Sequence, residues 1–194
     1  MKTRLLLNVM SAMIIAGISC NKEDAIQPLT RSDQSNSAQG HFIGEHFGGG
    51  IIFYLDKTKK HGIIAASEDL EEAASWSRKD TLNNATSIQI GAGVFNTMHI
   101  YKKQGDPGNE ADDYAAIECL ELVENGYSDW YLPSKNELNE MYLHKDIIGN
   151  FMPFAYWSST EINTTKAWLQ NFSNGVQVQQ LKTAGYAIRA VRYF

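Results

Sequence analysis

Cysteine is scarce in this chain of 194 residues, which contains only two, at positions 20 and 119. Because Cys20 lies in a leader-like segment near the N-terminus, the rest of the chain holds a single thiol and cannot close an internal disulfide. Cys119 lies in the apolar run of residues 115–120. This context predicts a buried structural thiol rather than a nucleophile.

Catalytic motifs are missing as well. The chain has no His-Glu-x-x-His, no Gly-x-Ser-x-Gly and no cysteine cluster. Its five histidines are scattered, at positions 41, 46, 61, 99 and 144. We therefore expect a protein that is not an enzyme and that needs no cofactor.

Basic residues are also fewer than acidic ones. Residues 41–194 carry 13 Lys and Arg against 19 Asp and Glu, which gives a net charge of −6 with histidine neutral. Nucleic-acid-binding domains present basic surfaces to phosphates. We therefore expect no nucleic-acid partner.

The N-terminus has the pattern of an exported protein. Lys2 and Arg4 precede an apolar run at residues 5–18, which is shorter than the roughly 20 apolar residues that span a bilayer. Residues 16–20, Ala-Gly-Ile-Ser-Cys, resemble the site at which lipoprotein signal peptidase cuts before a cysteine. Residues 1–19 are thus predicted to be a lipoprotein signal peptide, with Cys20 as the lipidation site. The alternative is an ordinary secretory peptide whose cysteine is incidental.

A polar segment follows, and we interpret residues 20–40 as a lipidated flexible tether to the membrane. Its start, Asn-Lys-Glu-Asp at 21–24, resembles the charged signal that directs Bacteroidetes lipoproteins to the outer face of the outer membrane. The predicted location is therefore the outer membrane, at the cell surface, although any solvated tether contains such charges. Asp80-Thr81-Leu82 resembles an O-glycosylation motif of the same bacteria, which implies a sugar on Thr81.

Residues 41–194 are predicted to form one α+β domain. Strands are expected at residues 51–55 and 62–66 as a hairpin, at 156–160, at 166–172 and 176–181 around Asn174-Gly175, and at 186–193. Residues 67–76 could form a short helix, residues 87–90 a strand, and a helical turn could follow Asn96.

Two helices are predicted between these strands. The first begins after Asp112 and Asp113 and carries Tyr114, Ile117, Leu120 and Val123 on one face, before Asn125-Gly126 ends it. The second opens at Ser134, which forms a capping box with Glu137.

Several segments together resemble a known family. They are GGIIFYLD at 49–56, HGIIAA at 61–66, NGYSDWYLPSKNEL at 125–138, YWSSTE at 156–161, AW at 167–168, NFSNG at 171–175 and RAVR at 189–192. This pattern resembles the Lcl C-terminal-like domain family of bacterial surface lipoproteins and adhesins, over residues 44–194. The resemblance implies a C-type-lectin-like fold, with two helices packed on small antiparallel sheets and the N- and C-terminal strands paired. It also implies attachment or glycan binding.

Other conspicuous residues have structural explanations. Trp130, Trp157 and Trp168 are core candidates, although aromatic rings can also stack on sugars. Arg189 and Arg192 could receive an anionic ligand, but pairing with acidic side chains of the domain itself is favoured. Residues 130–134 also resemble a block of formylglycine-generating enzymes, whose chemistry needs reactive cysteines that Cys119 alone cannot supply.

Acidic and amide side chains gather at residues 106–113. Asp106, Asn109, Glu110 and Asp112 are the only calcium candidates, and calcium prefers 6–8 oxygen ligands. The sequence lacks the EF-hand spacing and the Glu-Pro-Asn and Gln-Pro-Asp signatures of calcium-dependent lectins, and helix capping is a sufficient role for Asp112 and Asp113. We therefore expect no metal site.

The ligand is expected on the long irregular segment from Thr81 to Glu110. Long irregular segments in compact domains are often functional. Seven apolar residues (Ile88, Ile90, Val94, Phe95, Met98, Ile100 and Tyr101) are predicted to pin it to the core, so that Asn83, Asn84, Lys102 and Lys103 can contact a ligand. The alternative is that this loop merely covers a sheet.

The sequence therefore favours a surface lipoprotein whose domain is a non-catalytic binding or adhesion module, with a glycan as one candidate ligand. A structural or assembly lipoprotein that binds another envelope protein is the alternative. An enzyme of the formylglycine-generating fold ranks third.

Overall fold

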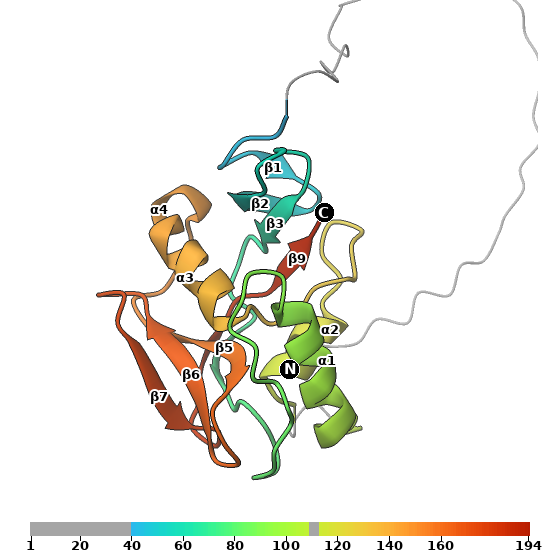
Figure 1. The fold of residues 1–194 in the computed structure, drawn as a ribbon, viewed down its shortest axis with the longest axis vertical. Coiled ribbons are helices and arrows are strands. Elements are labelled where there is room, and N and C mark those ends of the chain that lie inside the picture. Colours follow the sequence, from blue (N-terminus) through green and yellow to red (C-terminus); the bar gives the residue numbers. More distant parts are fainter. Residues whose placement is uncertain (1–39, 109–112) are drawn as a thin grey trace, which may run out of the picture. The chain divides into compact units, whose positions relative to one another are not determined.

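Two small β-sheets organise the domain in the computed structural model, which describes residues 40–108 and 113–194 (Figure 1). The predicted signal peptide, Cys20, the tether up to residue 39, and three calcium candidates (Asn109, Glu110 and Asp112) lie outside the described residues. No helix within the described ranges is long and apolar enough to cross a membrane.

The first sheet has the strand order β1-β2-β3-β9 and is antiparallel throughout. Its strands are β1 (His46–Phe47), β2 (Gly50–Leu55), β3 (Gly62–Ala65) and β9 (Val191–Tyr193). In the β2–β3 turn, the Asp56 carboxylate accepts hydrogen bonds from the backbone N–H and the hydroxyl of Thr58. The predicted hairpin is confirmed, and the C-terminal strand joins the sheet of the N-terminal strands, where its partner is β3 rather than the first strand.

The second sheet has five strands in the order β4-β8-β5-β6-β7. They are β4 (Glu71–Ala74), β5 (Ala155–Glu161), β6 (Lys166–Asn171), β7 (Gln177–Leu181) and β8 (Tyr186–Ile188). The predicted hairpin around Asn174-Gly175 is confirmed. The expectation of purely antiparallel sheets is wrong, because β5 and β8 are parallel. The helix predicted at residues 67–76 is also wrong, since β4 lies there and pairs with β8.

The predicted strand at 186–193 is in fact two strands, one in each sheet. Buried Arg189 lies at the break. Its guanidinium donates to Asp69 at 2.6 Å and to the carbonyl oxygens of Ala66 at 3.0 Å and Asn150 at 2.6 Å. These bonds hold the chain as it passes from one sheet to the other. The prediction that Arg189 pairs with an acidic residue is thereby confirmed, although the pair is largely buried.

Arg192 forms the second predicted pair. It donates to both carboxylate oxygens of Asp129, at 2.7 and 2.9 Å, and to the carbonyl oxygen of Gly48. The hydrogen bond from Arg192 lowers the pKa of Asp129 below its ordinary value. This pair ties the last strand to the turn before β2 and to the loop between α2 and α3.

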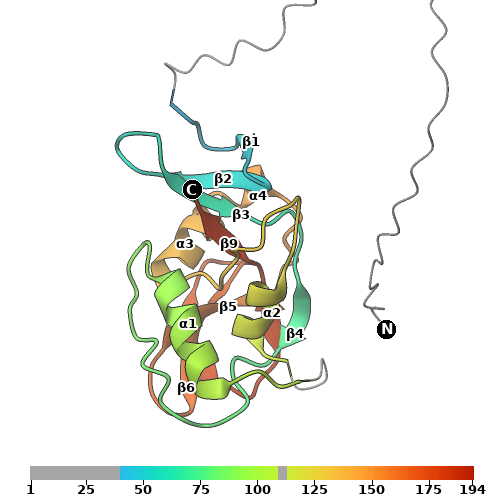
Figure 2. The same ribbon diagram turned by 90° about the vertical axis from the view of Figure 1, so that its right-hand side faces the viewer.

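The described residues contain four helices rather than the two predicted. They are α1 (Gly93–Gln104), α2 (Ala115–Glu121), α3 (Lys135–Leu143) and α4 (Lys145–Ile148). α1 and α3 both contact β5, and α3 also contacts β2 and β6. Figure 2 shows α1 and α2 side by side in front of β5. α1 replaces the single turn expected after Asn96, and the strand expected at 87–90 is absent.

Helix ends were predicted with mixed success. The capping box of Ser134 and Glu137 is present at the start of α3. α2, however, begins after Tyr114, so Asp113 is not its N-cap, and it ends before Leu122. Val123 is therefore outside the helix and is 71% exposed, not part of an apolar face.

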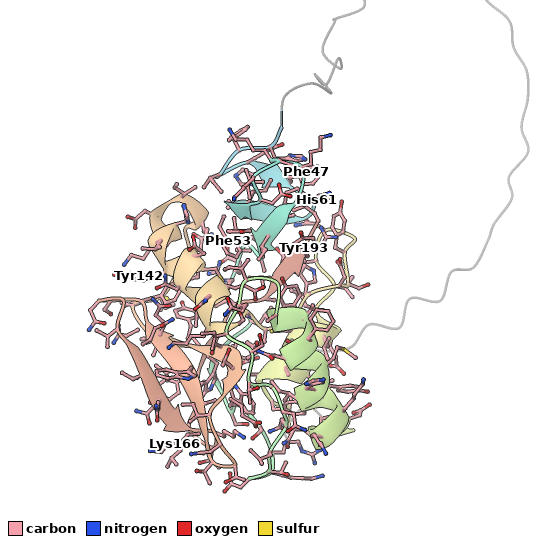
Figure 3. The ribbon with its side chains drawn as sticks, in the orientation of Figure 1. Phe47, Phe53, His61, Tyr142, Lys166 and Tyr193 are labelled. Atoms are coloured by element: carbon pink, nitrogen blue, oxygen red, sulfur yellow. The ribbon has the colours of Figure 1, made fainter. Side chains whose placement is uncertain are left out.

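The core consists of two clusters of buried side chains. Trp76, Trp130 and Trp157 belong to the first, and Phe53, labelled in Figure 3, belongs to the second. Trp130 and Trp157 are therefore core residues, as predicted. Trp168 is not, because it is partly exposed beneath the Lys135 ammonium, 3.6 Å from its ring centroid.

Cys119 is fully buried and free, which confirms the prediction of a structural thiol. Removal from water raises its pKa above the ordinary value. The thiol therefore stays protonated and is not available as a nucleophile.

Candidate functional site

The loop before α1 runs back along that helix and forms one unit with it. The carbonyl oxygen of Asn84 lies 2.9 Å from Nδ1 of His99, and Asn96 Nδ2 donates to the carbonyl oxygen of Ser87 at 2.7 Å. The Ala92 N–H donates to the carbonyl oxygen of Gln89 and closes the turn into the helix. Residues 84–88 are therefore neighbours of the α1 residues 95–99.

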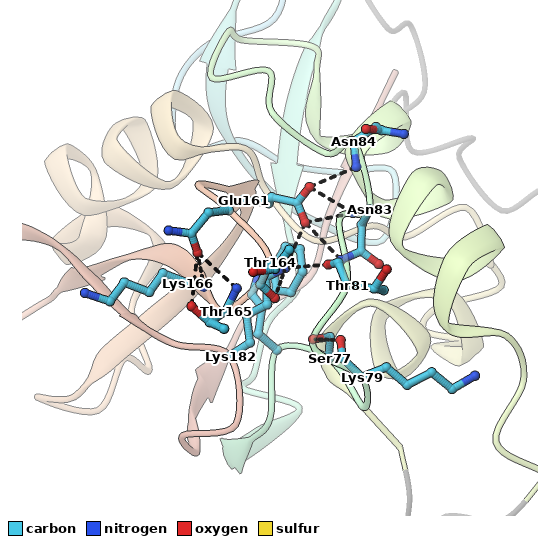
Figure 4. A network of polar contacts seen from close by, with 12 residues as sticks. Ser77, Lys79, Thr81, Asn83, Asn84, Glu161, Thr164, Thr165, Lys166 and Lys182 are labelled. Atoms are coloured by element: carbon cyan, nitrogen blue, oxygen red, sulfur yellow. Dashed lines mark hydrogen bonds and ion pairs between the residues drawn. The ribbon is translucent and has the colours of Figure 1, made fainter.

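A buried ion pair holds the start of this loop (Figure 4). Lys182 Nζ lies 2.8 Å from the Glu161 carboxylate, and both side chains are fully buried. Glu161 also accepts hydrogen bonds from the backbone N–H groups of Asn83 and Asn84 and from the Asn83 amide. Lys182 donates to the carbonyl oxygen of Thr81 at 3.0 Å. The pair therefore fixes residues 81–84 through their backbone.

The pKa of Glu161 reflects this environment. Burial by itself raises it, but the hydrogen bonds from Lys182 and Asn83 outweigh that effect and lower it below its ordinary value. Glu161 is therefore ionised at neutral pH, and the ion pair is present under physiological conditions.

Buried polar side chains link the two ends of α1 to other parts of the domain. At the start, Glu137 of α3 accepts from the Gly91 N–H at 2.7 Å while it caps its own helix through the Ser134 N–H. At the end, Gln104 accepts from the N–H groups of Arg78 and Lys79. Burial raises the pKa of Glu137, although the N–H groups that bind it act in the opposite direction.

The structure corrects part of the predicted ligand set. Asn83 is 1% exposed, and its amide bonds to Glu161 and Gln104, so it cannot contact a ligand. Asn84, Lys102 and Lys103 are exposed, as predicted. Asn84 lies beside His99, and the two lysines follow in the last turn of α1.

The apolar residues of this segment also differ from the prediction. Ile100 is buried, and Tyr101 and Ile90 pack partly against the core, as expected. Four others do not pin the segment, because Phe95 is 69% exposed, Ile88 39%, Val94 38% and Met98 37%. Leu82 of the same loop is 50% exposed. The buried side of α1 instead carries Gly93, Asn96, Thr97, Ile100 and Gln104.

We call the exposed side chains of this unit the α1 surface. It comprises the apolar Leu82, Ile88, Val94, Phe95 and Met98 and the polar Asn84, His99, Lys102 and Lys103. Arg78 and Lys79 are exposed and lie at its lysine end, because their N–H groups bind Gln104. Val94 and Phe95 therefore lie near the start of α1, and the basic residues lie near its end, where Leu82 adjoins Asn83, the partner of Gln104.

A groove on another part of the domain is a second candidate. It has a volume of about 430 Å³, and its lining includes Phe42, Tyr54, Lys59, Glu140 and His144. Phe42 is 63% exposed, and Glu140 and His144 come from the end of α3. We call it the Phe42 groove. Sequence reasoning missed it, because residues 41–59 and 140–144 meet only in the fold.

The two remaining sequence hypotheses stay predictions. Of the calcium candidates, Asp106 is described, and its carboxylate accepts from the Gly108 N–H. No cluster of three metal-binding side chains occurs within residues 40–108 and 113–194. Thr81 is partly exposed, with its carbonyl oxygen bound by Lys182 and Asn83, so glycosylation of its hydroxyl remains untested.

Comparison with known proteins identifies a family. No curated protein matches the sequence significantly. The profile of the Lcl C-terminal domain, however, matches residues 65–192, a range that contains the whole α1 surface and all five strands of the second sheet. This match confirms the resemblance seen in the sequence motifs. The chain therefore belongs to the Lcl C-terminal domain family.

Proposed function

We propose that this protein is a non-catalytic binding module, tethered to the cell surface by lipid on Cys20, that docks a protein partner through the α1 surface. The α1 surface is the observation that carries the proposal. Five large apolar side chains are exposed on one short unit, and Phe95 is the most exposed of them. Contiguous exposed apolar patches mark interaction sites in soluble domains.

The rigidity of the α1 surface supports a role in binding. The Glu161–Lys182 pair fixes the loop, and Glu137 and Gln104 fix the ends of the helix. Because the backbone is already ordered, a partner that docks here loses little conformational freedom on the side of this protein. The combination of exposed apolar residues with neighbouring polar and basic ones is also found in protein interfaces.

The buried state of Cys119 supports the non-catalytic reading, since a protonated thiol in the core cannot perform the cysteine chemistry of formylglycine-generating enzymes. A C-type-lectin-like fold is part of the proposal. It is supported by the family and by the pairing of β3 with the C-terminal β9.

The partner surface can be tested by site-specific photo-crosslinking in intact cells. A photoreactive residue in place of Ile88 should give one discrete adduct, which the second change Phe95→Ser should abolish. The control carries the photoreactive residue in place of Val123, which is 71% exposed on another loop. The same adducts from both positions, or an adduct that survives Phe95→Ser, would contradict docking at the α1 surface.

The lipid anchor and the surface location rest on the N-terminal sequence. Cys20→Ser should abolish metabolic lipid labelling and leave unprocessed precursor. Replacing Lys22, Glu23 and Asp24 together with Ala should reduce cleavage by protease added outside intact cells. Equal labelling of the wild type and the Cys20→Ser variant would remove the lipoprotein claim, and unchanged cleavage would remove the surface signal.

Glycan binding at the Phe42 groove is the second candidate. An exposed aromatic ring beside carboxylate, imidazole and ammonium groups is the combination that sugars require for stacking and hydrogen bonding. A glycan array probed with the mature protein would test it. A specific hit should be lost on Phe42→Ser and Glu140→Gln and kept on Phe95→Ser, whereas the reverse pattern would assign the glycan to the α1 surface.

A further inference from the structure

The outer edge of β7 is open. β7 is the last strand of the five-stranded sheet and pairs only with β6 among the described residues (Figure 1). Along two antiparallel strands, residue pairs that exchange backbone hydrogen bonds alternate with pairs that do not. The backbone N–H of Lys182 donates to the carbonyl oxygen of Thr165, and the backbone N–H of Asn171 donates to the carbonyl oxygen of Val176. The even-numbered residues of β7 therefore form the backbone hydrogen bonds to β6. The backbone groups of Gln177, Gln179 and Leu181 therefore point outward, away from the sheet.

The other sheet edges are short, acidic or covered. β1 has two residues, and β4 begins with Glu71-Glu72. On the outer side of β9, Val191 and Tyr131 exchange backbone hydrogen bonds of 2.9 and 2.8 Å. β7, with the sequence Gln-Val-Gln-Gln-Leu, has neither charge nor proline. Natural proteins normally protect an edge of this kind from pairing with another chain.

We propose that β7 pairs antiparallel with β7 of a second copy of this chain, around a two-fold axis at Gln179. In this register Gln179 lies opposite its own equivalent, and Gln177 lies opposite Leu181 of the partner. All three residues point their backbone groups outward, so each N–H meets a C=O across the axis. The two five-stranded sheets then form one continuous sheet.

Charge and side-chain pattern favour a second copy over an unrelated peptide. The strand is uncharged, so the two-fold pairing brings no like charges together, while a charged peptide would find no countercharge on β7. The nearest cation of β6, Lys166, lies opposite Leu181 at the end of the strand (Figure 3), away from the axis. Val178 is 37% exposed and lies diagonally across the axis from Val178 of the other copy, on the same face. Closed two-fold pairing is also the commonest symmetry of soluble oligomers.

Oxidative cross-linking of the Gln179→Cys variant on intact cells tests the register. The Cα atoms of a bonded antiparallel pair are about 5.5 Å apart, within the range that a disulfide bridges. Gln179→Cys should give a disulfide-linked dimer, whereas Lys60→Cys in the exposed β2–β3 turn should not. The native Cys119 is buried and does not interfere. Equal cross-linking of both variants, or none, would overturn the proposal.

Sedimentation of the lipidated protein in detergent tests the interface without a cross-link. The wild type should be a dimer. Gln179→Pro should weaken dimerisation by about ten-fold or more, because it removes an outward N–H that donates across the axis. The fold of each copy should persist, because edge strands tolerate proline. Circular dichroism should be unchanged. If Gln179→Pro disturbs the fold, Gln179→Lys, which places two ammonium groups at the axis, replaces it. A monomeric wild type, or a dimer that survives both changes, would refute the β7 pairing.

Discussion

Replacing Lys182 with methionine should destabilise the domain strongly, because it leaves the Glu161 carboxylate buried without a cation. Methionine keeps the apolar stem beside Trp76, over whose ring the Lys182 ammonium lies at 4.6 Å from the centroid. Removing one member of a buried ion pair typically costs about 3–5 kcal/mol. The carbonyl oxygens of Thr81 and Thr164 lose the hydrogen bond from Lys182 at the same time, and Thr81 keeps only the one from Asn83.

The loss of unfolding free energy can be measured by urea denaturation, with tryptophan fluorescence as the signal. For a domain of this size, about 3–5 kcal/mol corresponds to a fall in Tm of roughly 6–20 °C. The double variant Glu161→Gln/Lys182→Met should recover part of the loss, since neither residue then leaves a buried charge. A loss below about 1 kcal/mol would mean that the pair is accessible to water and that the reasoning is wrong.

The pH dependence gives an independent check. Because the pKa of Glu161 is lowered in the folded state, its ionised form stabilises the fold above the ordinary pKa of 4.5. That contribution is lost as the pH falls through the folded-state value. The difference in unfolding free energy between the wild type and Lys182→Met should therefore narrow below about pH 4.5. A constant difference from pH 7 to pH 3 would contradict the assignment of the loss to Glu161.

Three further predictions concern the fold. Gly50→Ala should destabilise by about 1–3 kcal/mol in chemical unfolding, since the added Cβ would clash with the Ala65 carbonyl oxygen; Gly126→Ala, where the Cβ meets nothing within 4 Å, has no such clash and should cost only what its positive φ imposes, so an equal loss in both variants would contradict the clash. Glu137→Ala should cost about 1–3 kcal/mol for each N–H that it leaves unpaired, and hydrogen exchange at Gly91 should accelerate; unchanged exchange there would disprove its role at the start of α1. Cys119 should react with a thiol reagent only after denaturation, and rapid labelling of the folded protein would show that the core is open.

Local signals predicted local structure well. The apolar run before Asp56 forms β2, Asn174-Gly175 joins β6 to β7, and Ser134 with Glu137 caps α3. In each case the residues that decide the conformation lie within a few positions of one another. These elements could therefore be predicted from the sequence.

Elements whose partners are distant in sequence could not be predicted. α1 buries Asn96, Thr97 and Gln104 and exposes Phe95, because the polar side chains find partners from other segments. A rule that places apolar residues inside assigned Val94, Phe95 and Met98 to the core, and all three are exposed. Asn83 was assigned to a ligand for the same reason, since its partner Glu161 is 78 residues away.

The passage of the C-terminal segment from β8 to β9 has a consequence for the order in which the domain folds. β3 and β4, formed from the first part of the domain, each need a strand from residues 186–193 as a neighbour. Neither sheet can be completed until residues 186–193 are available. If the chain crosses a membrane unfolded from its N-terminus, as the proposed lipoprotein would, β3 and β4 emerge before the strands that they pair with. Both sheets then wait for residues 186–193 to cross before they can close.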